Sequence, residues 1–195
     1  MVAALYVESD GVYAGLPDVD LWDEKRDARK YPGDYPVVAH PPCSRWCRLA
    51  GLIQARWGHK KGDDGGTFAA ALESVRKHGG VLEHPAYSDA WRAFGLPLPR
   101  RGMWIGTPKL GYVTEVDQAN YGHPARKATW LYAYGVDELP RLRWDRATGT
   151  ALVSACANHV PETESRPRIM KREASATPVE FRDVLLSIAR SVRRV

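Results

Sequence analysis

The stretch YPVVAHPPCSRWCRLAG, residues 35–51, places Cys43 behind two prolines at the end of an apolar, β-branched run. Proline fixes its own φ and lacks a backbone donor, so the pair presents the next side chain on a stiff turn. A helix that began directly afterwards would lower the pKa of the thiol through its dipole, and Arg45 and Arg48 would act in the same direction. A thiolate in such a position can add to an electron-poor ring carbon. The alternative is a buried cysteine that packs as a small apolar side chain.

Glu83, in the segment VLEHP, is the second candidate for chemistry. Burial at the end of an apolar strand raises the pKa of a carboxyl group, which can then share a proton with a ring nitrogen. A glutamate that caps a helix or forms a salt bridge is the alternative. Glu83 follows Cys43 by 40 residues, which fits one strand–helix–strand crossover. We therefore expect both side chains on neighbouring strands, at the same edge of a sheet.

The elements that must position these side chains follow an α/β order. The predicted strands cover residues 2–8, 17–22, 35–40, 80–85, 110–118 and 127–135. A helix or helical turn is predicted over residues 44–58. Further predicted helices cover residues 67–78 and 88–94, and a last helix begins at Thr177-Pro178. We expect a single α/β domain over residues 1–195, with a compact, Rossmann-like, mostly parallel sheet and flanking helices. In such sheets ligands bind at the carboxyl ends of the strands.

Three segments in this order, HPPCSRWCRLAG, LEHP and YGHPARKATWLYAYG, resemble the DNA (cytosine, carbon-5) methyltransferases. In that family PPCQ carries the nucleophile, ENV carries the glutamate that engages the cytosine ring nitrogen, and GVPQxRxR positions base and cysteine. The resemblance implies that Cys43 is the nucleophile and Glu83 the acid. Lys127 stands where the first arginine of the last segment stands. KREASATPVEFRDVLLSIAR is similar in position to the family's last motif, beside the cofactor pocket.

The resemblance also implies a cofactor and a substrate. The cofactor would be S-adenosylmethionine, with contacts from Asp10, Gly11, Asp23 and Asp27. The substrate would be DNA or a pyrimidine nucleotide, with contacts from Ser44, Arg45, Trp46, His84, Tyr121 and Arg126. A homodimer or a separate recognition partner would supply target recognition.

Three departures from the family leave other interpretations open. The family's Gly-rich loop after the first strand is not evident here. In addition, residues 9–16 are too few to form a helical crossover between the first two predicted strands. Ala125 and Thr129 replace the glutamine and the second arginine, and the segment before Lys171 is too short for a target-recognition domain. The chain is then either a minimal methyltransferase, a pyrimidine-modifying enzyme with another donor, or a non-catalytic nucleic-acid-binding relative.

A zinc site is a competing prediction. His40, Cys43, Cys47, Cys156 and His159 are suitable ligand types in the pattern H-x2-C-x3-C and C-x2-H. The C-x3-C spacing differs from that of a usual zinc knuckle, so we predict no metal.

Composition indicates a protein of a reducing compartment, which we predict to be the cytoplasm. Three cysteines do not make a disulfide framework, and no apolar run approaches the length of a membrane span. The N-terminus lacks the features of a signal peptide. The net charge of +5 permits a polyanionic partner. Residues 141–195 are rich in arginine, which fits either a solvated surface or a phosphate-facing patch.

Overall fold

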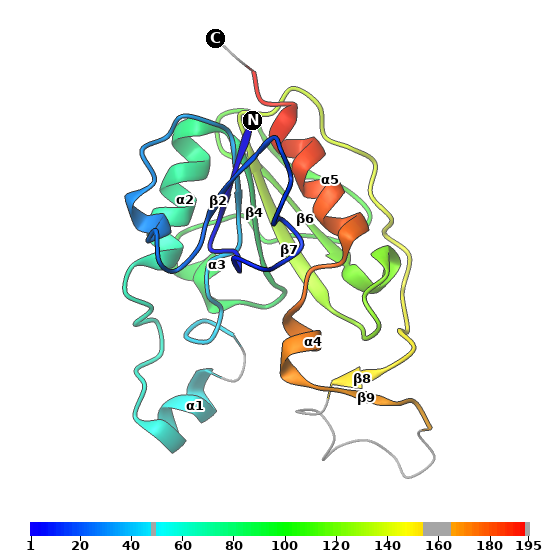
Figure 1. Cartoon of the computed structure of the whole chain (residues 1–195). Coiled ribbons are helices and arrows are strands. Elements are labelled where there is room, and N and C mark those ends of the chain that lie inside the picture. Colours follow the sequence, from blue (N-terminus) through cyan, green and yellow to red (C-terminus); the bar gives the residue numbers. More distant parts are fainter. Residues whose placement is uncertain (48–49, 154–164, 194–195) are drawn as a thin grey trace.

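The structure is a computed structural model that describes residues 1–47, 50–153 and 165–193. Strands form the centre of the molecule. Within this described part, seven strands form one sheet: β1 (Val2–Leu5), β2 (Val19–Trp22), β3 (Val37–Ala39), β4 (Gly80–Pro85), β5 (Ile105–Thr107), β6 (Gly111–Asp117) and β7 (Ala128–Tyr134). Their order across the sheet is β2-β1-β3-β4-β7-β6-β5 (Figure 1).

The first four strands of that order run parallel, whereas β7 runs antiparallel to both β4 and β6, and β5 runs antiparallel to β6. The chain moves outward from β1 to β2 and then returns to place β3 on the other side of β1. This reversal is a topological switch point, and the crevice outside the carboxyl ends of such strands is the usual ligand site of an open α/β sheet.

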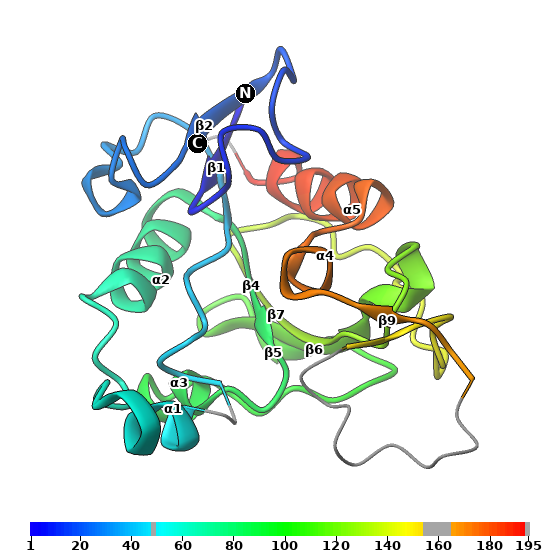
Figure 2. The ribbon, with the colours of Figure 1, turned by 60° about the horizontal axis from the view of Figure 1, so that its bottom comes forward.

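Two helices cover opposite faces of the sheet, and Figure 2 shows the sheet between them: α2 (Thr67–His78) and α5 (Val179–Arg190). Alternate residues of a strand point to opposite faces. Leu5 and Leu82 accordingly pack in the cluster that holds α2, while Ala4 and Val81 pack in the cluster that holds α5. Burial on both faces explains why β1 and β3 are apolar without alternation.

Shorter elements complete the described part: α1 (Ala50–Trp57), α3 (Asp89–Ala93), α4 (Lys171–Ser175), the 3-10 helices η1 (Ala28–Lys30) and η2 (Gln118–Tyr121), and the two-stranded sheet of β8 (Leu152–Val153) and β9 (Arg168–Ile169). The predicted α/β class, with helices flanking a sheet, is confirmed. The sheet is more mixed than predicted, because β5 and β7 run against the other strands. β5 lies in a Pro- and Gly-rich stretch, outside the predicted strands.

Gly80 shows why the turn from α2 into β4 needs glycine. Its φ is +126°, and a Cβ atom there would lie 1.9 Å from the carbonyl oxygen of Val37. β4 therefore starts directly against β3, so the residues that follow their carboxyl ends lie side by side.

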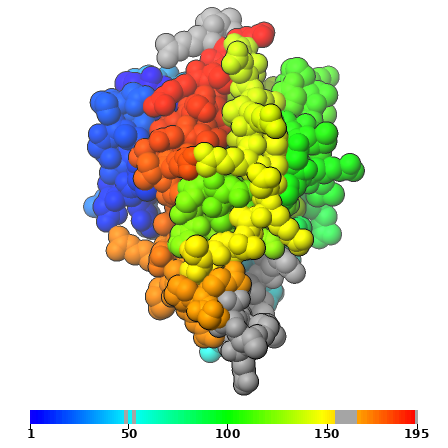
Figure 3. Space-filling view, turned by 90° about the vertical axis from the view of Figure 1, so that its right-hand side faces the viewer, coloured from blue at the N-terminus to red at the C-terminus, as the bar shows by residue number. Residues whose placement is uncertain are grey.

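The segment from residue 136 to β8 runs over the surface between α5 and the edge of the sheet (Figure 3). Leu142 is buried there, and Trp104 donates a hydrogen bond to the carbonyl of Pro140 at 3.0 Å. Among the described residues, the helices are all too short or too polar to cross a membrane.

Candidate active site

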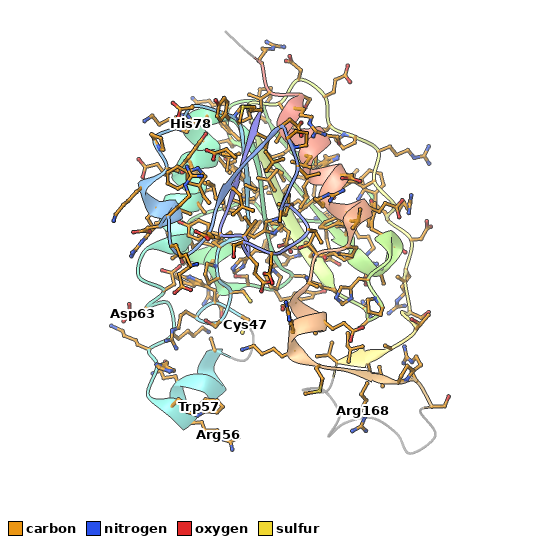
Figure 4. The ribbon with its side chains drawn as sticks, in the orientation of Figure 1. Cys47, Arg56, Trp57, Asp63, His78 and Arg168 are labelled. Atoms are coloured by element: carbon orange, nitrogen blue, oxygen red, sulfur yellow. The ribbon has the colours of Figure 1, made fainter. Side chains whose placement is uncertain are left out.

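The three predicted catalytic residues lie at one edge of the sheet. Cys43 follows β3, Glu83 lies in the last half of the neighbouring β4, and Lys127 directly precedes β7, which pairs antiparallel with β4. The charges of Glu83 and Lys127 both act on the Cys43 thiol. The sequence therefore predicted correctly that Cys43 and Glu83 come from neighbouring strands. Cys47, one turn further along, marks this edge in Figure 4, beside α1.

Glu83 is buried, and both of its carboxylate oxygens have partners. Oε2 lies 2.9 Å from Nδ1 of His40, and Oε1 accepts a hydrogen bond from Nε2 of Gln118 at 3.1 Å. Burial alone would raise the pKa of this carboxyl group. The hydrogen bond and charge of His40, aided by Lys127, outweigh burial and lower the pKa of Glu83 to about 2. Our expectation of a raised pKa is wrong, because a partner stabilises the ionised form.

His40 connects this carboxylate to Tyr13. Its Nε2 lies 2.8 Å from the hydroxyl of Tyr13, a buried residue of the loop between β1 and β2. Burial, followed by the charge of Glu83, raises the pKa of Tyr13 well above its usual value, so the phenol keeps its proton. Both ring nitrogens of His40 thus have a partner, and the ring links the Glu83 carboxylate to the Tyr13 phenol. From the sequence, we predicted a role for His40 only as a candidate zinc ligand. Its position directly after β3 was the available signal.

The Cys43 thiol is partly buried and is protonated at rest. Burial, then the neighbouring Cys47 and Glu83, raise its pKa to about 11, although Lys127 acts in the opposite direction. The expected helix does not begin at once, since α1 starts only at Ala50. A single turn intervenes, in which the Cys43 carbonyl accepts hydrogen bonds from the backbone of residues 46 and 47. Our expectation of a lowered thiol pKa is therefore wrong.

Lys127 binds the chain between α4 and α5. Its ammonium donates hydrogen bonds to the carbonyls of Ser175 and Ala176, each at 2.9 Å. Burial lowers its pKa, and the charges of Glu83 and Cys43 oppose that shift. Lys127 thus anchors the α4–α5 connection to the site and brings positive charge to it.

The predicted substrate contacts divide into accessible and inaccessible side chains. Ser44 is exposed, and Arg45 and Trp46 are partly buried. Nε1 of Trp46 donates to Asp64 at 2.8 Å, so this indole fixes the loop that precedes α2. Arg126 is half exposed and pairs with the fully buried Asp117 at 3.2 Å.

Two predicted substrate contacts lie in the core and are corrected here. His84 is fully buried, with its ring against Phe68 and Trp91. Tyr121 is also buried, and its hydroxyl accepts a hydrogen bond from the backbone of Arg143 at 2.7 Å. Neither side chain reaches the surface of the site, because each packs on the interior side of its segment.

The predicted cofactor contacts do not fit S-adenosylmethionine well. The Asp27 carboxylate is held by the guanidinium of Arg29 at 2.7 and 3.0 Å. Asp10 is exposed, and one of its oxygens pairs with Arg172 at 3.4 Å. Asp23 accepts a backbone hydrogen bond from residue 26, and the loop that contains Gly11 runs from β1 to β2 without a helix. These carboxylates are thus engaged mainly by neighbouring protein groups.

A metal centre has no support in the described part of the chain, which contains no cluster of three or more histidine, cysteine or acidic side chains suited to an ion. Both ring nitrogens of His40 already have partners. Cys156 and His159, two of the candidate zinc ligands, lie outside the described residues.

The fold and the site together define an α/β protein with a cysteine, a glutamate and a histidine at the carboxyl edge of its parallel strands. Comparison with known proteins adds no relative: no family model, curated protein or solved structure matches the chain.

Proposed function

We propose that the protein modifies a pyrimidine base at carbon 5, with Cys43 as the nucleophile that attacks carbon 6. One observation supports this proposal above the others: Cys43, Glu83 and Lys127 come from the ends of three adjacent strands and act on one another electrostatically. They also lie beside the switch point of a Rossmann-like sheet, where ligands bind. The substrate is cytosine in DNA, following the resemblance of these segments to the cytosine methyltransferases.

In the proposed reaction, Glu83 transfers a proton from the thiol to the ring. The resting thiol is protonated and the resting carboxylate is ionised. As the sulfur lone pair forms the bond to carbon 6, Glu83 accepts the thiol proton. The ring electrons shift through carbons 5 and 4 toward the ring nitrogen, which takes that proton from Glu83. Carbon 5 is now nucleophilic and takes up an electrophile. A water molecule then takes the carbon-5 proton as the carbon–sulfur bond breaks. The proton on the ring nitrogen returns by way of Glu83 to the departing sulfur, which restores the aromatic ring and the thiol.

His40 acts in this scheme as a positioning residue. Together with Gln118 it fixes the orientation of the Glu83 carboxylate, and its hydrogen bond and charge keep that carboxylate ionised. Tyr13 in turn fixes the orientation of the His40 ring. Such buried, fully paired networks keep a catalytic group in a single geometry.

S-adenosylmethionine is the donor that the resemblance implies, and it would supply a methyl group to carbon 5. The described residues provide few free contacts for it, so no step above depends on it. Another electrophile would use the same activated ring. A free cysteine nucleophile suits a reducing compartment such as the cytoplasm.

Hydrogen exchange at carbon 5 tests the proposal without a donor. In heavy water, reversible attack by Cys43 lets deuterium replace the carbon-5 proton, which mass spectrometry of the recovered base detects. We expect exchange in a cytosine oligonucleotide or in cytidine monophosphate. Cys43→Ala should abolish it, whereas the matched variant Cys47→Ser should retain it. The absence of exchange in every pyrimidine tested, or exchange that persists in Cys43→Ala, would refute the proposal.

The second candidate is a non-catalytic nucleic-acid-binding protein. Two observations favour it. The raised pKa keeps the Cys43 thiol protonated, and two backbone carbonyls already accept hydrogen bonds from the Lys127 ammonium. This function predicts salt-dependent nucleic-acid binding that survives Cys43→Ala and no carbon-5 exchange.

A further inference from the structure

A cavity of about 380 Å³ lies beside the start of β7, outside the site described above. Its walls come from the residues before β7, from the segment that leads into β8, and from the chain before β9. Three arginines line it: Arg126, Arg146 and Arg166. Alanine, threonine, leucine and valine side chains make up the rest of the described lining, which contains no carboxylate.

The arginines bring hydrogen-bond donors to this cavity. Arg126 uses Nε to pair with Asp117, which lies behind it, while about half of its side chain stays exposed. Arg166 donates an Nη1 hydrogen bond to the Thr148 carbonyl at 2.8 Å. Arg146 is exposed and makes no hydrogen bond or ion pair with another described residue. A guanidinium carries five donors in a planar fork, a geometry that matches the oxygens of a phosphate.

Backbone contacts hold the walls of this cavity together. The Pro124 carbonyl accepts hydrogen bonds from the N–H groups of Thr150 and Ala151, at 2.7 and 2.9 Å. Gly149 has φ +71°, and a Cβ atom on it would lie 2.8 Å from the backbone nitrogen of Arg126. The backbone segment that carries Arg146 is thus fixed against the segment that carries Arg126, so both side chains start from one joined wall of the cavity.

We propose that this arginine pocket binds a phosphate group of the pyrimidine substrate. Arg126 and Lys127 are consecutive residues, and Lys127 acts on Cys43 and Glu83. A phosphate held by Arg126, Arg146 and Arg166 therefore lies on the same edge of the molecule as the thiol. The inference depends on the proposed function for the identity of the base, but not for the phosphate.

Binding measurements with and without a base test the pocket. The probes are a fluorescent single-stranded cytosine oligonucleotide, the same strand with an abasic site, and cytidine monophosphate. Arg146→Gln and Arg166→Gln are the test variants. Arg193 pairs with Asp137 at the opposite end of the sheet, so Arg193→Gln is the matched control. Arg126 is left unchanged, because its removal would leave the buried Asp117 unpaired.

We expect each test variant to weaken binding of both strands by roughly tenfold, as expected when a charge-assisted hydrogen bond is removed. The slope of log K against log salt should fall by about 0.7 for each phosphate that the variant no longer neutralises. Selective weakening of cytidine monophosphate alone would also support the pocket and would identify a free nucleotide as the source of the phosphate.

Binding of all three probes within about twofold of wild type in both test variants would overturn the proposal, as would an equal weakening in Arg193→Gln. Circular dichroism and thermal melts verify that each variant is folded. Cys43→Ala should bind the abasic strand like wild type. Failure of the proposed chemistry, seen as absent carbon-5 exchange, is therefore distinguishable from failure of the phosphate pocket.

Discussion

The reactivity of Cys43 offers the most direct test of the electrostatics of the site. Burial, Cys47 and Glu83 raise the pKa of this thiol from 9.0 to about 11. A shift of this size lowers the thiolate population at neutral pH about a hundredfold. A more basic thiolate is intrinsically more nucleophilic, which returns about a factor of ten. Alkylation by iodoacetamide should therefore be about tenfold slower than for an unfolded cysteine, and limited access slows it further.

Charge substitutions should change that rate in opposite directions. Glu83→Gln removes an anion that raises the thiol pKa, so alkylation of Cys43 should accelerate. Lys127→Met removes a cation that lowers the thiol pKa, so alkylation should slow. Arg193→Met, at the other end of the molecule, should leave the rate unchanged. Thermal melts must accompany Lys127→Met, because it also removes two hydrogen bonds to the α4–α5 connection.

Peptide mass spectrometry resolves the cysteines without further substitutions. Trypsin cuts after Arg45, which places Cys43 and Cys47 in separate peptides. Between about pH 7 and pH 9.5, the logarithm of the Cys43 rate should rise steadily, while in urea it should begin to level off near the ordinary thiol pKa. A native rate that levels off at the same pH as in urea would refute the reasoning. So would Glu83→Gln and Lys127→Met shifting the rate in the same direction.

Two further predictions concern stability. Burial lowers the pKa of His84 from 6.5 to about 4. Between these two pH values the unfolded chain therefore binds more protons than the folded chain. The free energy of unfolding should fall by about 3 kcal/mol as the pH drops through this interval. Urea titrations should show a decrease that is larger in wild type than in His84→Phe by about this amount, and an equal decrease in both would contradict the assignment. Because the predicted cofactor contacts are largely paired, S-adenosylmethionine should raise the melting temperature little; a rise of several degrees would show that the described contacts understate the cofactor site.

The sequence was sufficient to predict that Cys43 and Glu83 come from neighbouring strands at one edge of the sheet. The apolar runs before Cys43 and Glu83 mark buried strands, and the helical segments between them allow a crossover of about the right length. In the sequence, Gly79 and Gly80 together indicate only the end of a helix. The close approach of Gly80 to Val37, which brings β4 against β3, depends on backbone geometry that no residue pattern specifies. β5 was missed because its neighbours, proline and glycine, indicate a loop whatever the pairing of the strand.

Charge could not be predicted in the same way, because a pKa depends on partners that are distant in the chain. Burial of Glu83 was foreseen, yet the shift has the opposite sign, since His40 lies 43 residues away in sequence and 2.9 Å away in space. For Cys43 the helix dipole was the expected partner, but α1 begins only at Ala50, too far along the chain to act on the thiol. Sequence spacing thus predicts which strands are neighbours, whereas the sign of each pKa shift follows from the burial and the partners that the fold gives each group.

Both corrections constrain the mechanism in the same direction. In the proposed mechanism a thiol with a raised pKa must lose its proton as it attacks. An ionised Glu83 whose pKa is about 2 can relay that proton only in concert with the attack, because holding it alone is unfavourable. The pair as first predicted, a thiolate with a protonated acid, would have transferred a proton only from carboxyl to ring. The observed pair must move one proton from sulfur to ring nitrogen by way of the carboxylate. Glu83→Gln should consequently increase alkylation of Cys43 while abolishing carbon-5 exchange, a combination that a purely structural glutamate would not produce.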